Sequence, residues 1–245
     1  MIPDWLHILS ICMVLTGLGS FLYLLVKVVR HPQHMGVMNV VWPITGLYAG
    51  PLAIWFYERY GRLGRDDIAK AAMERDEPMP HMAETPYAAK IGKGATHCGA
   101  GCTLGDIIAE TLAFMVPAVA LWFGYKTIFA DKIFAVWILD YILAFLFGIA
   151  FQYASIKPMN PDMGAGQALI ASLKADTLSL TSWQVGMYGF MALAHFAVFG
   201  ALLGVALDVS MVEFWAAMQI AMICGFITAY PVNRWLIGRG IKEAM

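Results

Sequence analysis

Long runs of apolar residues, separated by short polar segments, make up most of this chain. A bilayer core of about 30 Å is crossed by a helix of about 20 apolar residues. Six runs reach that length, so the pattern predicts an all-α polytopic membrane protein, with residues 1–245 forming a single transmembrane domain. The predicted spans cover residues 5–29, 36–57, 104–129, 133–153, 182–207 and 211–236.

Two polar segments interrupt this pattern. Residues 58–103 form the only sizeable loop, and the charges scattered among apolar residues 62–75 predict a short amphipathic helix on the lipid headgroups. Residues 167–181 have a helical rhythm but carry too many polar side chains for a span. We expect them to form an interfacial or partly re-entrant helix.

Composition supports a membrane protein and argues against a nucleic-acid-binding protein. The chain is 60% hydrophobic and only 13% charged, whereas soluble domains are about one-quarter charged. A formal net charge of -1 gives no basic excess, so nucleic acid is not an expected partner. With six spans, the side that holds both termini and the 58–103 loop has most of the Lys and Arg, which predicts that both termini are cytoplasmic.

The strongest candidate for chemistry is a short motif at the start of the third predicted span. His97, Cys98 and Cys102 supply soft and borderline ligands that suit Cu(I) or Zn²⁺, in a compartment where thiols stay reduced. Asp106 and Glu110 continue the spacing of four, which would form one row on a helix. The alternative is a glycine-rich helix cap with two incidental thiols.

Methionines give a second signal. Met187, Met191 and His195 recur at a spacing of four on the fifth predicted span, where thioether and imidazole ligands would pass Cu(I) along one face. Core packing is the competing explanation and is favoured for these helices. In the 58–103 loop, Met79-Pro80-His81-Met82 repeats the same donors and would form a soft-metal capture arm, or else a plain solvated loop.

Ionisable residues at membrane depth are costly and are site candidates. Asp140 of the fourth span and His195 of the fifth would form a proton or cation relay, or a structural hydrogen bond between helices. The second span contains Pro43, Gly50 and Pro51, which predict a broken helix whose freed carbonyls bind an ion, although a structural kink is the commoner outcome.

Three stretches, residues 38–48, 97–106 and 174–181, resemble a family of bacterial integral membrane proteins known as domain of unknown function 4396. The resemblance implies a compact polytopic fold in the bacterial cytoplasmic membrane and supplies no established activity. It adds Asn39, Asp176 and Thr177 to the residues of interest.

The sequence therefore favours a membrane protein that binds and translocates a soft cation, with Cu(I) first and Zn²⁺ second. The expected partners are the lipid bilayer, the metal ion, a cytoplasmic metal chaperone and, for an oligomer, further copies of the chain. One alternative is a thiol redox protein in which Cys98 and Cys102 pass electrons to quinone or haem, although haem is not favoured. Another is a structural or assembly subunit that needs no site. No nucleotide-binding, hydrolase or kinase motif is present, so no catalytic residue is assigned.

Overall fold

The computed structural model describes residues 1–243, which form helices and no β-sheet. Five helices are long and apolar enough to cross a bilayer: α1, α6, α8, α9 with its continuation η3, and α10. Their bounds are α1 Asp4–Arg30, α6 Tyr87–Met115, α8 Lys132–Met159, α9 Ala165–Ala192, η3 Leu193–Leu202 and α10 Val212–Gly238. The shorter helices are α2 Met38–Ala49, α3 Pro51–Phe56, η1 Tyr57–Gly61, η2 Arg62–Gly64, α4 Asp66–Glu74, α5 Pro80–Ala83 and α7 Ala118–Trp122.

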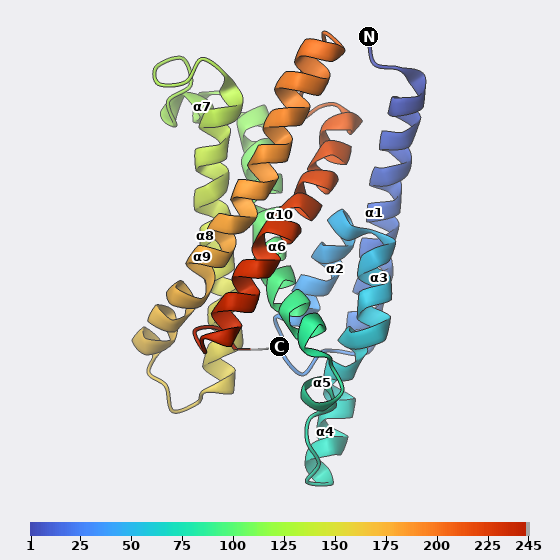
Figure 1. Cartoon of the computed structure of the whole chain (residues 1–245), viewed down its shortest axis with the longest axis vertical. Coiled ribbons are helices and arrows are strands. Elements are labelled where there is room, and N and C mark those ends of the chain that lie inside the picture. The colour runs from blue at the N-terminus through green and yellow to red at the C-terminus, as the bar shows by residue number, and fades with distance from the viewer. Residues whose placement is uncertain (244–245) are drawn as a thin grey trace.

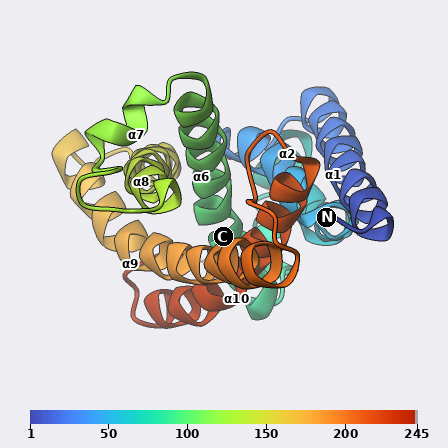
Figure 2. The same cartoon turned by 90° about the horizontal axis from the view of Figure 1, so that it is seen from above.

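Helix α6 lies at the centre of the bundle. Seen from above, α8 and α9 lie on one side of it and α1 and α2 on the other, while α10 packs along α9 and α6 (Figure 2). Most of the α6 surface is therefore enclosed by protein, and its buried residues run from Ala89 to Ala113. Polar groups on this helix can be held at membrane depth without facing lipid.

Close packing of α6 against α8 depends on two glycines of the His-Cys motif region. A Cβ atom at Gly101 would lie 2.9 Å from the backbone nitrogen of Gly148, and one at Gly105 would lie 2.6 Å from that of Ala144. The glycines thus let the two backbones approach each other. As a result, α6 begins at Tyr87 rather than near residue 104, and the motif lies within a buried helix instead of in the 58–103 loop. The short helix expected in that loop is present as α4.

The second predicted span does not cross the bundle. Residues 36–57 form α2 and α3, which run in opposite directions as a hairpin that enters and leaves at the same end (Figure 1). Gly50 makes the turn with a φ of 55°, and Pro51 begins α3. Contacts with α1 fix the levels: Gly50 lies beside Thr16, whereas Glu58 forms a 2.8 Å ion pair with Lys27, eleven positions further along α1. At twelve residues, α2 is about 18 Å long, too short for a bilayer.

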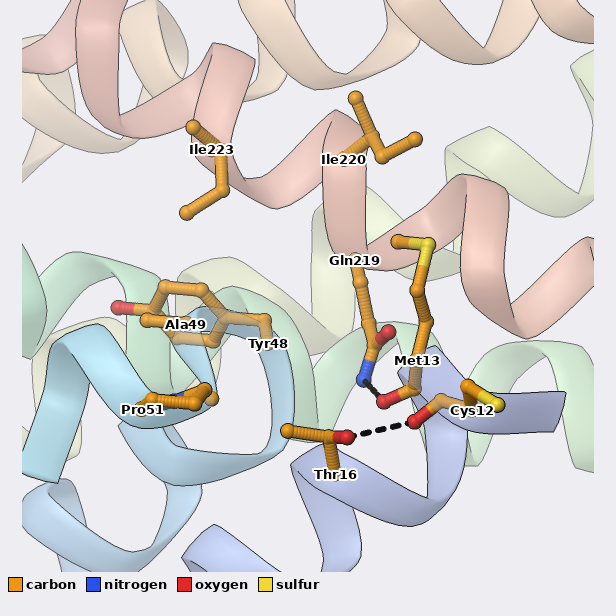
Figure 3. A pocket seen from close by; sticks show the side chains of 10 residues that line it. Cys12, Met13, Thr16, Tyr48, Ala49, Pro51, Gln219, Ile220 and Ile223 are labelled. Atoms are coloured by element: carbon orange, nitrogen blue, oxygen red, sulfur yellow. Dashed lines mark hydrogen bonds between the residues drawn. The ribbon is translucent and has the colours of Figure 1, made fainter. Parts of the chain in front are cut away.

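The tip of this hairpin is held by α10. The Gln219 side-chain amide donates a hydrogen bond to the carbonyl oxygen of Leu47, at 2.6 Å. It also donates to the carbonyl oxygen of Met13, at 3.3 Å (Figure 3). Carbonyl groups at a helix end inside a membrane need such a donor, since no water is available. A cavity of about 280 Å³ lies beside Gln219, between α1, the hairpin tip and α10 (Figure 3).

The re-entrant hairpin changes the predicted topology. With five candidate spans, the start of α1 and the end of α10 lie at opposite ends of the bundle (Figure 1). The expectation that both termini share one side counted residues 36–57 as a sixth span, whereas the structure folds them into the hairpin. Residues 167–181 also differ from expectation, since they form the first part of the continuous helix α9 rather than a separate interfacial or re-entrant helix.

Candidate functional site

The His-Cys motif is buried in α6, and its three side chains have different neighbours. Nε2 of His97 lies 2.8 Å from the sulfur of Met38 on α2. Cys98 faces α9 instead, because successive residues on a helix point about 100° apart. Cys102, one turn further on, is fully buried in the hydrophobic core with Trp183 and Met222. These three side chains thus face separate surroundings, unlike the shared point that the motif predicts.

Cys98 is the centre of a buried polar cluster, which we call the Cys98 cluster: Gly94, Cys98, Asp176, Ser179, Asn233 and Lys242. The Cys98 sulfur lies 2.9 Å from Oδ1 of Asp176 and 2.9 Å from Oγ of Ser179. Asn233 Nδ2 donates to the same Ser179 oxygen at 2.6 Å. The Lys242 ammonium lies 3.3 Å from the sulfur and 3.6 Å from Oδ1 of Asp176. The cluster therefore pairs a buried carboxylate with a buried cation.

A second polar group, the carboxyl pair, lies two turns further along α6. The side chains of Asp106 and Asp140 are both buried, and neither carboxyl oxygen of Asp106 has a hydrogen-bond partner among the described residues. Tyr188 on α9 donates a 2.8 Å hydrogen bond to Oδ2 of Asp140. Glu110 is also buried, one turn beyond Asp106. The spacing of four therefore places Cys98, Cys102, Asp106 and Glu110 on the buried side of one helix, as the sequence predicts.

Other predicted site residues lie elsewhere. His195 lies in the π-helix η3 and forms no hydrogen bond with Asp140, whose side-chain hydrogen-bond partner among the described residues is Tyr188. The relay between Asp140 and His195 is therefore not formed. Asn39 accepts a hydrogen bond from the backbone of Gln33, and Thr177 is exposed. Met187 and Met191 are buried in the hydrophobic core, as expected for packing residues.

Soft donors gather in a cavity of about 380 Å³ at the end of the bundle that holds α4 and α5. We call it the methionine cavity. Among the described residues that line it, Lys93 alone has a formal charge at neutral pH, and none is an Asp or Glu. Its sulfur and imidazole groups belong to Met35, Met38, Met79, Met82, Met159, His34 and His81.

The imidazole of His81 is neutral at physiological pH. Burial lowers the pKa of His81 to about 4, and the charges of Lys93, His34 and Lys90 act in the same direction. Its Nδ1 atom is buried without a hydrogen-bond partner within residues 1–243. A neutral imidazole with a free nitrogen is able to accept a metal ion.

A further cavity of about 270 Å³ adjoins the carboxyl pair. Asp106 and Thr103 of α6 line it together with Met218 and Met222 of α10. Within residues 1–243, no group of three or more His, Cys, Asp or Glu side chains is arranged to hold a metal ion. The soft donors that do come together are mainly thioethers.

Sequence reasoning missed several residues of these groups. Ser179, Tyr188 and Asn233 are polar residues within apolar helices, and that signal alone marks them as candidates. Lys242 had no comparable signal, because it follows α10 and meets Cys98 across 144 positions of sequence.

Five helices that are long and apolar enough to cross a bilayer indicate a helical membrane protein. A family model described as domain of unknown function (DUF4396) matches residues 89–242, and the chain belongs to that family. The matched region begins in the first turn of α6 and ends at Lys242, so it leaves out α1 and the hairpin. No curated protein and no solved structure matches the chain.

Proposed function

We propose that this protein binds a soft monovalent cation, most suitably Cu(I), and moves it across the membrane. The observation that carries the proposal is the methionine cavity. Met38 lines this cavity, and its sulfur contacts His97 deeper in the bundle, so the cavity leads to the His-Cys motif. Cys98 is the next residue of α6 and faces α9 rather than α2, so in the proposed path the cation passes around α6 from one donor to the other. Such donors are those that Cu(I) prefers.

The lining of the methionine cavity also argues against hard cations. Ca²⁺ and Mg²⁺ bind through carboxylate, carbonyl and water oxygens, but no Asp or Glu lines this cavity. Lys93 adds a positive charge that disfavours divalent ions further. Zn²⁺ is a weaker candidate than Cu(I), because thioethers outnumber imidazoles and no thiol lines the cavity.

Inward of Cys98, the proposed path follows α6. Cys102 comes next, and then the cavity in which Asp106 lies beside Met218 and Met222. We assign Asp106 and Glu110 to a second station that neutralises the charge of the cation at membrane depth.

The direction of the protein in the membrane follows from its charges. Of the 16 Lys and Arg residues, only Lys126 and Lys132 belong to the end that holds the start of α1. The positive-inside rule then assigns the opposite end, with the methionine cavity, to the cytoplasmic side of a bacterial inner membrane. The amino terminus is external in this arrangement, and a cytoplasmic metal chaperone is the natural donor to the cavity.

Metal binding to the purified protein tests the proposal. Under reducing conditions, Cu(I) is titrated in competition with a chromophoric Cu(I) chelator. We expect Met38→Leu and His97→Asn to weaken binding by about tenfold or more, equivalent to about 1.4 kcal/mol. Met115→Leu is the matched control, because Met115 is 73% exposed on the outer surface of α6. Uptake of Cu(I) by proteoliposomes tests translocation.

The outcomes separate the alternatives. Wild-type protein without measurable Cu(I) affinity overturns the proposal. Reversible oxidation of Cys98 and Cys102 by a quinone, without metal binding, supports a thiol redox protein instead. If neither Cu(I) binding nor thiol oxidation is observed, the protein is instead a structural or assembly subunit, and it should tolerate replacement of both thiols.

A further inference from the structure

The side chain of Lys242 is completely buried although it belongs to the segment that follows α10. Gly240, with a φ of 67°, turns this segment back toward the bundle. The Lys242 ammonium then lies 3.2 Å from the carbonyl oxygen of Gly94 and 3.3 Å from the Cys98 sulfur. A lysine is rarely fully buried, because its charge must be stripped of water and then paired.

The groups around this ammonium form a ligand set suited to a metal cation. They comprise a backbone carbonyl oxygen, the Cys98 sulfur and the Asp176 carboxylate, and each lies within 3.6 Å of the nitrogen. The second carboxylate oxygen of Asp176 is buried without a hydrogen-bond partner among the described residues. If Lys242 served only to anchor the segment after α10, oxygen acceptors around its ammonium would suffice. The thiol of Cys98 at the centre of the cluster adds a ligand for soft metal ions.

The position of this cluster links it to the proposed path. Cys98 follows His97 directly, and His97 contacts Met38 in the wall of the methionine cavity. In the proposed path, a cation that passes from His97 around α6 to the adjacent Cys98 reaches the place that the Lys242 ammonium fills.

We propose that the Lys242 ammonium is an internal substitute for the transported cation, which holds the Cys98 cluster closed until a soft monovalent ion displaces it. This inference rests on the proposed function and adds its regulation: arrival of Cu(I) releases the segment that follows α10. One monovalent cation replaces another, so the charge of the buried cluster is unchanged. The Cys98 proton passes along its 2.9 Å contact to the Asp176 carboxylate as sulfur binds Cu(I), so that atoms and charge balance.

Thiol modification tests the closure without metal. In Lys242→Ala, we expect N-ethylmaleimide to modify Cys98 about tenfold faster than in wild type, because the vacated space opens a thiol that is 0% exposed, and this gain in access outweighs the loss of the neighbouring cation that favours the thiolate. Mass spectrometry assigns the modified cysteine, and exposed Cys12 is the internal standard. Arg239→Ala is the matched control, because it removes an exposed cation from the same segment. Lys242→Arg, which keeps the charge, should stay close to wild type.

Proteolysis tests the displacement. In wild-type protein, added Cu(I) should accelerate tryptic cleavage after Lys242, while cleavage after exposed Arg75 stays constant. An unchanged rate after Lys242 at saturating Cu(I) overturns displacement, and an unchanged Cys98 rate in a folded Lys242→Ala protein overturns closure. Failure of Cu(I) to bind overturns both the proposed function and the displacement of Lys242, whereas the closure of the Cys98 cluster by Lys242 is decided separately by the modification rate in metal-free protein.

Discussion

The hydroxyl of Tyr188 donates to Oδ2 of Asp140 at 2.8 Å and also lies 2.9 Å from the backbone carbonyl oxygen of Trp137. The rings of Tyr188 and Trp137 stack with their centroids 4.5 Å apart. This arrangement fixes the Tyr188 hydroxyl over the carboxyl pair, so that α9 supplies a hydrogen-bond donor to a buried acid on α8.

Tyr188→Phe should destabilise the protein. The substitution keeps the ring and its stacking on Trp137 but leaves a buried carboxylate oxygen of Asp140 without its donor, which costs about 1–3 kcal/mol. Thermal unfolding in detergent measures the loss. Tyr230→Phe provides the comparison, because the hydrogen bond of Tyr230 to Ala88 lies at the surface and its removal should cost less. Equal effects of the two substitutions would contradict this account of Tyr188.

Asp106 should carry a proton. Both carboxyl oxygens of Asp106 are buried without a hydrogen-bond partner among the described residues, and an isolated buried carboxylate takes up a proton rather than stay charged, whereas Asp140 accepts a hydrogen bond from Tyr188. Infrared difference spectra should therefore lose a carboxylic acid carbonyl band in Asp106→Asn, which keeps the size and polarity of the side chain. The band should persist in Asp131→Asn, since Asp131 is exposed. Its persistence in Asp106→Asn would place the proton elsewhere.

Gly105→Ala should separate α6 from α8. The new Cβ would lie within 2.8 Å of two backbone atoms of Ala144, and backbone atoms inside a packed helix pair cannot turn aside. Overpacking of this kind costs about 1–3 kcal/mol. Gly189→Ala is the control, because nothing lies within 4 Å of the added atom, and it should stabilise α9 by about 0.5–1 kcal/mol. Unfolding measurements that rank the two variants in the opposite order would refute close packing at Gly105.

The sequence predicts the long helices of this fold well, because length and apolarity directly mark a membrane span. It fails at the hairpin, since residues 36–57 are as apolar as a crossing helix. Tertiary contacts decide the path of these residues. Gln219 donates a hydrogen bond to the carbonyl oxygen of Leu47 at the tip, and Gly46 lets the hairpin pack closely against α1, because a Cβ there would meet the α1 backbone. Neither contact is visible in the local pattern.

The candidate site shows the same division. Spacing alone predicts that Cys98, Cys102, Asp106 and Glu110 share one side of a helix, because helical periodicity is a local property. It does not predict their partners, which come from α9, α8 and the segment after α10. The link between Cys98 and Lys242 exists only because α6 and α10 pack together, so only the folded structure reveals it.

Stability should depend on pH through His81. The pKa of His81 is lowered to about 4 in the folded protein, first by burial and then by nearby positive charges. An unfolded histidine has a pKa of about 6.5, so the unfolded chain binds more protons between these values and stability falls as pH drops from about 6.5 to about 4. His81→Gln should reduce this dependence of the melting temperature. An identical pH profile in both proteins would show that His81 contributes nothing.

The re-entrant hairpin predicts the sidedness of three surface positions. Asp4 and Asp131 belong to the end at which α1 begins, whereas Glu74 lies at the end of α4 on the opposite side of the bundle. Cysteines introduced singly at these exposed positions can be labelled with a membrane-impermeant maleimide in intact cells and in inverted vesicles. Asp4→Cys and Asp131→Cys should react in cells, and Glu74→Cys only in inverted vesicles, because in the proposed five-span topology α1 separates Asp4 from Glu74 and α6 separates Glu74 from Asp131. Had residues 36–57 crossed the bilayer, Asp4→Cys and Glu74→Cys would react on the same side and Asp131→Cys on the other.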